Sequence, residues 1–388
     1  MTKAGLSDDD LAVDHELADI AASFRFLLDL TPIDLAGASR AFDADGRPPR
    51  FRYRALEDDP AVVAKRLDGL AVDTVADPAL ASLLLAKQRE LRLQVEMLCC
   101  RDSPDFLPLS IELYGAVSPT LLQEAHTILD DVAPPGPSAG PWLDASAFAA
   151  CAQTELDHYR SLAPSIESHV EVREGSTGVM VSNGDVLIAP TARFAESRVH
   201  ALLQHEVGTH VVTHVNGANQ PLHVLASGLA GHDETQEGLA VLAEHLVGGL
   251  TARRLRQLAG RVVAVHAMVE GAGFGDVHGD LVDSGMSSGE AFSITARVYR
   301  SGGLTKDAIY LRGLRELVDH LTSGGSLSSL WLGKLPLQAA PVVADLHQRG
   351  ALQDALVLPR YLEDAGARQR LAHLPQVTSL TSLIGDTA

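Results

Sequence analysis

Apolar residues recur at helical spacing along most of the chain. The longest such stretch, residues 77–101, repeats aliphatic side chains at Leu80, Leu83, Leu84, Leu91 and Val95. Asp77 is suited to cap the N-terminus of this helix, and Pro78 to occupy its first turn. Similar patterns predict helices at about 119–129, 195–213, 237–246, 251–270, 288–300, 306–321 and 336–349.

Strand patterns are concentrated in one short region. Two runs rich in β-branched residues, 178–182 and 185–189, are joined by Asn183 and Gly184. This dipeptide favours a type I′ turn, so the two runs predict a β-hairpin just before the helix at 195–213. A hairpin followed by several helices is typical of a mostly helical α+β fold.

A proline-rich segment divides the chain. Four prolines fall within residues 134–141, where they can continue neither a helix nor a central strand. We therefore predict a linker or long loop at 134–141, an N-terminal, mainly helical region at 1–133 and a larger domain at 142–388. A chain of 388 residues is long enough for two such units.

Composition narrows the range of functions. The chain carries 50 acidic and 31 basic side chains, a formal net charge of −19, which disfavours binding to nucleic acids and anionic membranes. The first residues lack the pattern of a secretory signal, no long apolar stretch occurs, and three cysteines are too few for a disulfide framework. We therefore expect a cytoplasmic protein; the oligomeric state is not indicated.

Histidines gather in one region. Seven of the 16 lie between His200 and His245, and the segment from His205 reads His-Glu-Val-Gly-Thr-His. Two histidines four residues apart on a helix, with a glutamate after the first, commonly hold a catalytic zinc ion. Here the two histidines, His205 and His210, are five apart, which on a regular helix separates their side chains by about 140°. A one-residue bulge would bring them together, and Gly208 beside β-branched Thr209 offers a weak point for it.

A second arrangement in the same segment needs no distortion. Glu206, His210 and His214 are each four residues apart and share one face of a regular helix. This trio would bind a metal ion, or it would be only a solvated polar face. The residues alone leave these alternatives open.

Several motifs carry a family resemblance. The segments HEVGTHVVTHVNGANQPL at 205–222 and TQEGLAVLAE at 235–244 resemble the bacterial proteins named for a QEGLA motif. They are also similar to the animal microtubule-associated tyrosine carboxypeptidases. The resemblance covers most of the chain, because it continues in TPID at 31–34, ELYG at 112–115, SNGD at 182–185, RVYRSGG at 297–303, TKDAIYLRG at 305–313 and LWLGK at 330–334.

The resemblance implies a site and an activity. It implies a zincin-like fold, with a small sheet beside the active-site helix, and one Zn²⁺ ion per chain. His205 and His210 would be zinc ligands, Glu237 of the QEGLA segment the third ligand and Glu206 the general base, which decides against the undistorted trio. The implied activity is that of a zinc metallocarboxypeptidase, which removes a tyrosine, another aromatic residue or an acidic residue from the C-terminus of a peptide or protein.

A carboxypeptidase must also bind the terminal carboxylate of its substrate, a task that suits basic side chains. The candidates for substrate binding are Arg297, Arg300, Lys306 and Tyr310, which flank a Gly-Gly break able to turn the chain back toward the metal. An ordinary ion pair is the alternative for each basic residue. Two other functions stay open: a peptidase of another specificity, such as an endopeptidase or a trimmer of modified peptides, and a non-catalytic regulatory protein that retains the metal site.

Overall fold

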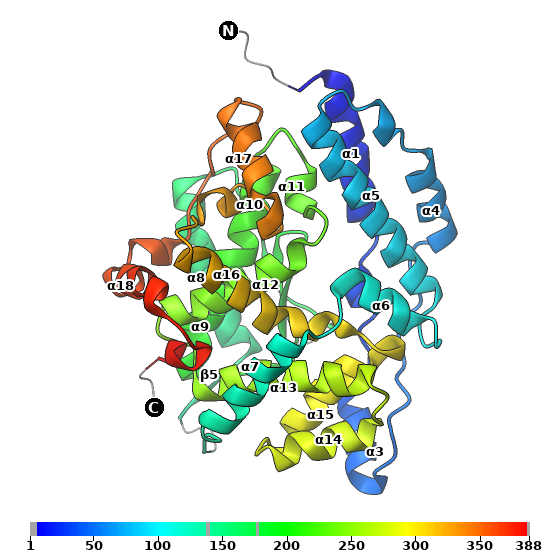
Figure 1. Ribbon diagram of the computed structural model, residues 1–388, viewed down its shortest axis with the longest axis vertical. Coiled ribbons are helices and arrows are strands. Elements are labelled where there is room, and N and C mark those ends of the chain that lie inside the picture. The colour runs from blue at the N-terminus through cyan, green and yellow to red at the C-terminus, as the bar shows by residue number, and fades with distance from the viewer. Residues whose placement is uncertain (1–5, 137–139, 176–177, 386–388) are drawn as a thin grey trace.

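The computed structural model describes residues 6–136, 140–175 and 178–385, which form a mostly helical α+β fold (Figure 1). The α-helices are α1 (Asp8–Ser23), α2 (Phe26–Asp29), α3 (Leu35–Asp45), α4 (Pro60–Gly69), α5 (Pro78–Cys99), α6 (Phe106–Tyr114), α7 (Pro119–Asp131), α8 (Ala145–Leu162), α9 (Glu196–His205), α10 (Val212–Ala218), α11 (Val224–Ser227), α12 (His232–Leu246), α13 (Ala252–Val269), α14 (Phe274–Asp283), α15 (Ser288–Tyr299), α16 (Ile309–Thr322), α17 (Ala340–Gln348) and α18 (Ala365–His373). The strands are β1 (Trp142–Asp144), β2 (Val170–Val172), β3 (Val179–Ser182), β4 (Asp185–Ile188) and β5 (Arg193–Ala195).

The predicted long helix is confirmed as α5. The side chain of Asp77 accepts hydrogen bonds from the backbone N–H groups of Ala79 and Leu80, which would otherwise lack partners in the first turn. Its leucines Leu80, Leu84 and Leu91 are buried. In Figure 1, α1 and α4 lie beside α5 along one flank of the molecule, and these helices also contact one another through their apolar faces.

Two predicted helices are longer than expected. The helix expected at 237–246 begins at His232, because Gly231, with φ of 73°, ends the preceding turn and acidic residues in the first turn suit the positive end of a helix. The helix expected at 195–213 continues to Ala218 after an irregular turn. The stretch expected as a helix at 306–321 starts as a 3₁₀ turn, Thr305–Ala308, and becomes α16.

The predicted hairpin is confirmed. Strands β3 and β4 pair antiparallel with Ser182 opposite Asp185, and the two turn residues Asn183 and Gly184 have φ of 49° and 85°. Positive φ at both positions is the signature of a type I′ turn. Strand β2 joins the other side of β4 in parallel, so β3 is an edge of this three-stranded sheet, while β1 and β5 form a separate antiparallel pair.

One large hydrophobic core extends through most of the described chain. It includes Leu17 of α1, Ile128 of α7, Leu258 of α13 and Leu314 of α16, so it is shared between the two sides of the proline-rich segment. Residues 137–139 of that segment lie outside the described ranges. On its described part, the carbonyl oxygen of Gly136 accepts a hydrogen bond from Arg253. The division into domains at 134–141 stays a prediction.

Helices α12 and α16 pack against each other at the centre of the fold, and α7 lies along α13 (Figure 1). This central group positions the site described below. Among the described helices, none combines the length and apolar composition that crossing a lipid bilayer requires.

Candidate metal centre

The chain leaves the regular α-helix immediately after His205. Helix α9 ends there, residues Glu206–Val211 form a π-helical turn, and α10 follows. In a π-helix the hydrogen bonds connect residues five apart, so side chains with that spacing lie above one another. The distorted turn predicted from the five-residue spacing is therefore confirmed, and Gly208 and Thr209 lie within it.

Two local features accommodate the π turn. The hydroxyl group of Thr209 donates a hydrogen bond of 2.9 Å to the carbonyl oxygen of Gln204, five residues earlier. A Cβ atom on Gly208 would lie only 2.4 Å from the side-chain oxygen of Gln204, so a larger residue would have to displace this buried side chain, which donates a hydrogen bond to Glu155. A glycine and a hydroxyl residue at adjacent positions thus accommodate the turn.

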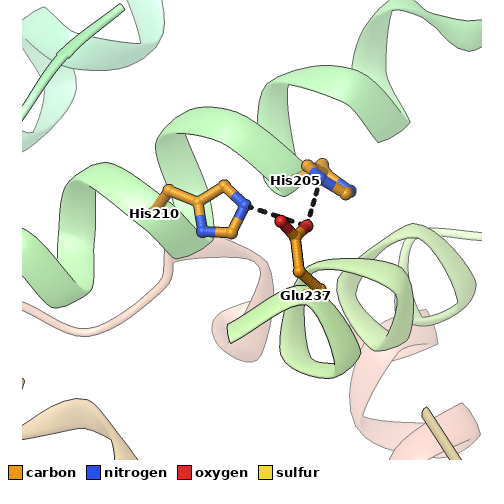
Figure 2. A group of neighbouring side chains, drawn as sticks. All are labelled: His205, His210 and Glu237. Atoms are coloured by element: carbon orange, nitrogen blue, oxygen red, sulfur yellow. Dashed lines mark ion pairs between the residues drawn. The ribbon is translucent and has the colours of Figure 1, made fainter. Parts of the chain in front are cut away.

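The π turn brings three ligating side chains together. The Nε2 atoms of His205 and His210 lie 3.8 Å and 3.7 Å from the same oxygen, Oε2 of Glu237. Figure 2 shows both imidazoles on the one helix, facing Glu237 on α12. The three ligand atoms all lie within 4.8 Å of one another. Among the described residues, no other group of three or more His, Cys, Asp or Glu side chains is arranged so that it could hold a metal ion.

The undistorted trio is not brought together as a metal site. His214 lies one turn beyond His210, and its Nδ1 atom is 3.3 Å from the carbonyl oxygen of Ala226. Burial lowers the pKa of His214 to about 4, with a further contribution from the nearby cation of Lys334. His214 instead lines a cavity that does not include the three ligating side chains.

A buried carboxylate holds the first histidine. The Nδ1 atom of His205 lies 2.9 Å from Oε1 of Glu244, which is fully buried. Glu244 also accepts hydrogen bonds from Arg198 and Arg254. Burial alone would raise the pKa of Glu244, but Arg254, the bond to His205 and Arg198 hold it far below its usual value. A neutral His205 that donates Nδ1–H to this carboxylate would keep the lone pair of Nε2 for a metal ion on the side of Glu237.

A buried lysine holds the third ligand. The ammonium group of Lys306 donates a 3.0 Å hydrogen bond to Oε1 of Glu237 and lies 3.4 Å from Oδ1 of Asp233. The Gly302-Gly303 break, with φ of 103° and 119°, turns the chain ahead of this lysine. Burial opposes ionisation of Glu237, yet Lys306 and the two imidazoles keep its pKa well below the usual value.

The glutamate between the ligands has a different environment. Glu206 is buried, and no hydrogen bond to its carboxylate occurs within the described residues. Burial raises the pKa of Glu206, and only the imidazoles of His205 and His210 counteract this effect. A carboxylate with a raised pKa beside a metal site is well suited to accept a proton.

The predicted substrate-binding residues fall into two groups. Lys306 and Tyr310 lie close to Glu237, with the Lys306 nitrogen 5.5 Å from the centre of the Tyr310 ring. Arg297 lies on α15 and forms a bidentate pair with Asp307, at 2.6 Å and 2.7 Å. Arg300 is buried farther along, where it donates to the hydroxyl group of Thr31 at 3.3 Å.

Sequence reasoning missed Glu244 and its arginine partners, and it assigned Lys306 to substrate binding rather than to support of Glu237. Glu244 follows Glu237 by seven residues, which is two helical turns, so both carboxylates lie on one face of α12. The spacing of these two glutamates could therefore have predicted from the sequence that Glu244 lies near the metal centre. The arginine partners of Glu244 come from α9 and α13 and had no such signal, because their proximity arises from packing between helices.

The three-stranded sheet lies beside the histidine helix. Both β3 and β4 pack against the π turn, and Val186 and Ile188 of β4 share the core with Val207 and Val211. Strand β3 is the last strand on its side of this sheet, and among the described residues no strand pairs with its outer edge. An edge strand with this placement can accept an extended peptide through main-chain hydrogen bonds.

Comparison with known proteins identifies the family. The chain is 27% identical over 191 residues to microtubule-associated tyrosine carboxypeptidase 1 of Mus musculus, in a match that covers 45% of this chain and 39% of the mouse protein. The chain therefore aligns with less than half of that relative. The family model described as microtubule-associated tyrosine carboxypeptidase matches residues 41–378, which includes every residue of the candidate centre. Because this match spans most of its length, the chain belongs to the microtubule-associated tyrosine carboxypeptidase family.

Proposed function

We propose that the protein is a zinc-dependent carboxypeptidase that removes the C-terminal residue of a peptide or protein. The observation that carries the proposal is the convergence of His205, His210 and Glu237, with Glu206 directly beside them. Membership of a family named for tyrosine carboxypeptidases supports the same reaction and suggests tyrosine as the residue removed. Another aromatic residue or an acidic residue is the alternative at that position.

The donor set fits zinc. Two imidazole nitrogens and one carboxylate oxygen are the ligands found in many catalytic zinc sites, which keep a further position open for water or substrate. Side chains supported by an outer shell of partners bind metal more tightly, and here Glu244 supports His205 while Lys306 supports Glu237. A bound zinc ion would supply Lewis acidity, polarising the peptide carbonyl and acidifying water.

The side chains of the protein would then divide the remaining tasks. Glu206 would accept a proton from the attacking water and deliver it to the nitrogen of the leaving amino acid. Burial of Glu206 away from other hydrogen-bond donors favours this exchange, because its carboxylate is not stabilised by a fixed partner. The edge of β3 would hold the peptide extended across the site.

The terminal carboxylate needs a cationic or hydroxyl partner. We retain Arg297, Arg300, Lys306 and Tyr310 as proposed substrate-binding residues, although three of them already have partners in the protein. Tyr310 has no hydrogen bond to its hydroxyl group within the described residues, and burial raises its pKa, so the hydroxyl stays protonated and able to donate. Among the described residues, the Tyr310 hydroxyl group and the Nε atom of Arg300 are therefore the polar groups of this set that lack a hydrogen-bond partner.

Metal analysis and peptide digestion test the proposal together. Purified protein should contain close to one zinc ion per chain, and the His205→Ala variant should lose it. Digestion of a peptide library should release single C-terminal residues, as read by mass spectrometry. Internal cleavage would contradict the carboxypeptidase assignment in favour of an endopeptidase, and bound zinc without any cleavage would favour a regulatory protein.

The role of Glu206 has its own test. The Glu206→Gln variant should keep the metal and lose turnover, whereas Glu112→Gln, at an exposed position on α6, should change neither. Full turnover by Glu206→Gln would remove this residue from the mechanism while leaving the metal site intact.

A further inference from the structure

A cavity of about 400 Å³ is lined by His214, which lies on α10 one helical turn after the proposed ligand His210. Its walls come from α1, the tip of the β3–β4 hairpin, α10, α11 and the segment after α16. Its polar lining consists of Asp19, Asn183, His214, His223, Ser227 and Lys334. This volume is in the range of sites that bind a small molecule or a few residues of a peptide.

Lys334 is the notable group in this cavity. Its ammonium group has no carboxylate or hydrogen-bond partner within the described residues, although the side chain is more than half buried. The two fully buried lysines, Lys87 and Lys306, each have a carboxylate at 2.6 Å and 3.0 Å respectively. Removing a cation from water without a counter-charge is unfavourable. Burial accordingly lowers the pKa of Lys334 to about 8.

The lining itself supplies little compensation for this charge. Asp19 is the acidic residue among the lining residues, and it is exposed on α1, where water screens it. His214 is held neutral by its lowered pKa, to about 4. Outside the lining, the carboxylates of Asp233 and Glu237 are near enough to interact electrostatically with Lys334, but both are paired with Lys306. The groups that line the cavity around the ammonium group are thus mostly neutral, and a partly desolvated positive charge among them suits an incoming anion.

The position of the cavity relates it to the metal centre. His214 lies four residues after His210 on the same helix, so the two side chains are neighbours one turn apart. Asn183 is at the tip of the hairpin, at the end of the free edge of β3. Lys334 is also near enough to interact electrostatically with Asp233 and Glu237. A peptide extended along β3 past the metal would reach the cavity within about two residues, since one helical turn advances about 5.4 Å and one extended residue about 3.3 Å.

We propose that Lys334 and this cavity form a carboxylate-binding subsite for the peptide substrate. The inference rests on the proposed function in one respect: it assumes that the ligand is a peptide. The carboxylate belongs either to the C-terminus of that peptide or to an acidic side chain close to the cleaved bond. Both sources offer the same chemistry to Lys334, and binding experiments separate them.

The test measures peptide affinity rather than turnover. The full chain carrying Glu206→Gln is loaded with zinc, and its affinity is measured by fluorescence anisotropy for a labelled peptide that ends Glu-Glu-Glu-Tyr. Two further peptides carry a C-terminal amide, or glutamine in place of each glutamate. Adding Lys334→Met should weaken binding of the first peptide about 10- to 100-fold, as expected for loss of a charged hydrogen bond.

The three peptides identify the source. If Lys334 binds the terminus, Lys334→Met weakens the free-acid peptides with either side chain and leaves the amide unaffected. If Lys334 binds an acidic side chain, Lys334→Met weakens both glutamate peptides and leaves the glutamine peptide unaffected. Lys334→Arg should restore most of the affinity in either case, because it restores the charge.

The matched control is Lys65→Met, which removes the same charge from an exposed position on α4. Equal affinities for Lys334→Met and Lys65→Met, in protein that melts like the parent, would overturn the proposal. Failure of the proposed function gives a different pattern. In that case the wild type cleaves none of the peptides, while the dependence of binding on Lys334 persists.

Discussion

Nδ1 of His205 lies 2.9 Å from Oε1 of Glu244, and this contact connects the candidate metal centre to two arginines, Arg198 on α9 and Arg254 on α13. The carboxylate that orients the imidazole is itself fully buried, and its charge is compensated by Arg198 and Arg254. The first proposed ligand is therefore positioned by contacts among α9, α12 and α13.

Replacing Glu244 should weaken metal binding without touching a proposed ligand. We expect Glu244→Gln to lower zinc affinity about 10- to 100-fold, because His205 loses the charged partner that orients its ring and raises its basicity. Competition with a chromophoric chelator measures the affinity. Glu112→Gln serves as the control, and an unchanged affinity in folded Glu244→Gln protein would contradict the role given to Glu244.

Lys306 should matter for stability as well as for any contact with substrate. We expect Lys306→Met to reduce the free energy of unfolding of metal-free protein by about 3 kcal/mol or more, because Glu237 and Asp233 lose their shared cation. Urea denaturation in the presence of a chelator measures this. Lys306→Arg should recover part of the loss. A variant as stable as the wild type but with a raised KM would instead identify Lys306 as a substrate-binding residue alone.

Gly208 should respond to alanine in the opposite sense from an ordinary helical glycine. Gly→Ala in a helix usually stabilises by up to about 1 kcal/mol. At Gly208 the new methyl group would meet the Gln204 side chain at 2.4 Å, so we expect destabilisation of about 1–3 kcal/mol and weaker zinc binding. A methyl group added at Gly279, inside α14, would meet no other atom within 4 Å, and Gly279→Ala should stabilise the protein. The melting temperatures of the two variants test this prediction. If both substitutions raise the melting temperature, packing does not require a glycine at position 208.

The largely buried His232 should make the protein sensitive to acid. Burial lowers its pKa from 6.5 to about 4, so the folded protein keeps this imidazole neutral while the unfolded chain takes up a proton. Its contribution to stability is present above pH 6.5 and is lost as the pH falls toward 4, on the order of 3 kcal/mol in total.

The comparison of His232→Asn with wild type isolates this effect. The variant should show a flatter dependence of the free energy of unfolding on pH between 6.5 and 4, measured by chemical denaturation at several pH values. Replacement of His126, which is exposed on α7, should leave the pH dependence as it is in the wild type. Parallel curves for wild type and His232→Asn would exclude His232 as a source of acid sensitivity.

Local patterns were enough to predict several elements of the fold. The capping of α5 by Asp77, the type I′ hairpin at Asn183-Gly184 and the distorted turn between His205 and His210 all depend on residues close together in the chain. Their energetics are dominated by hydrogen bonds and backbone preferences within a few residues. The early start of α12 was missed because its first residues after Gly231 are polar and show no apolar periodicity.

The sequence by itself determined which residues could form a metal site, because the spacing of His205 and His210 and the family motifs restrict the ligating groups. Only the tertiary structure decided how those groups are paired: Lys306 with Glu237, Glu244 with His205, and Lys334 with no carboxylate within the described residues. These relationships join residues from 39 to 69 positions apart where a bond exists. They arise from helix packing around a shared core, and the periodicity of one segment carries no information about which charged group on another helix will face it.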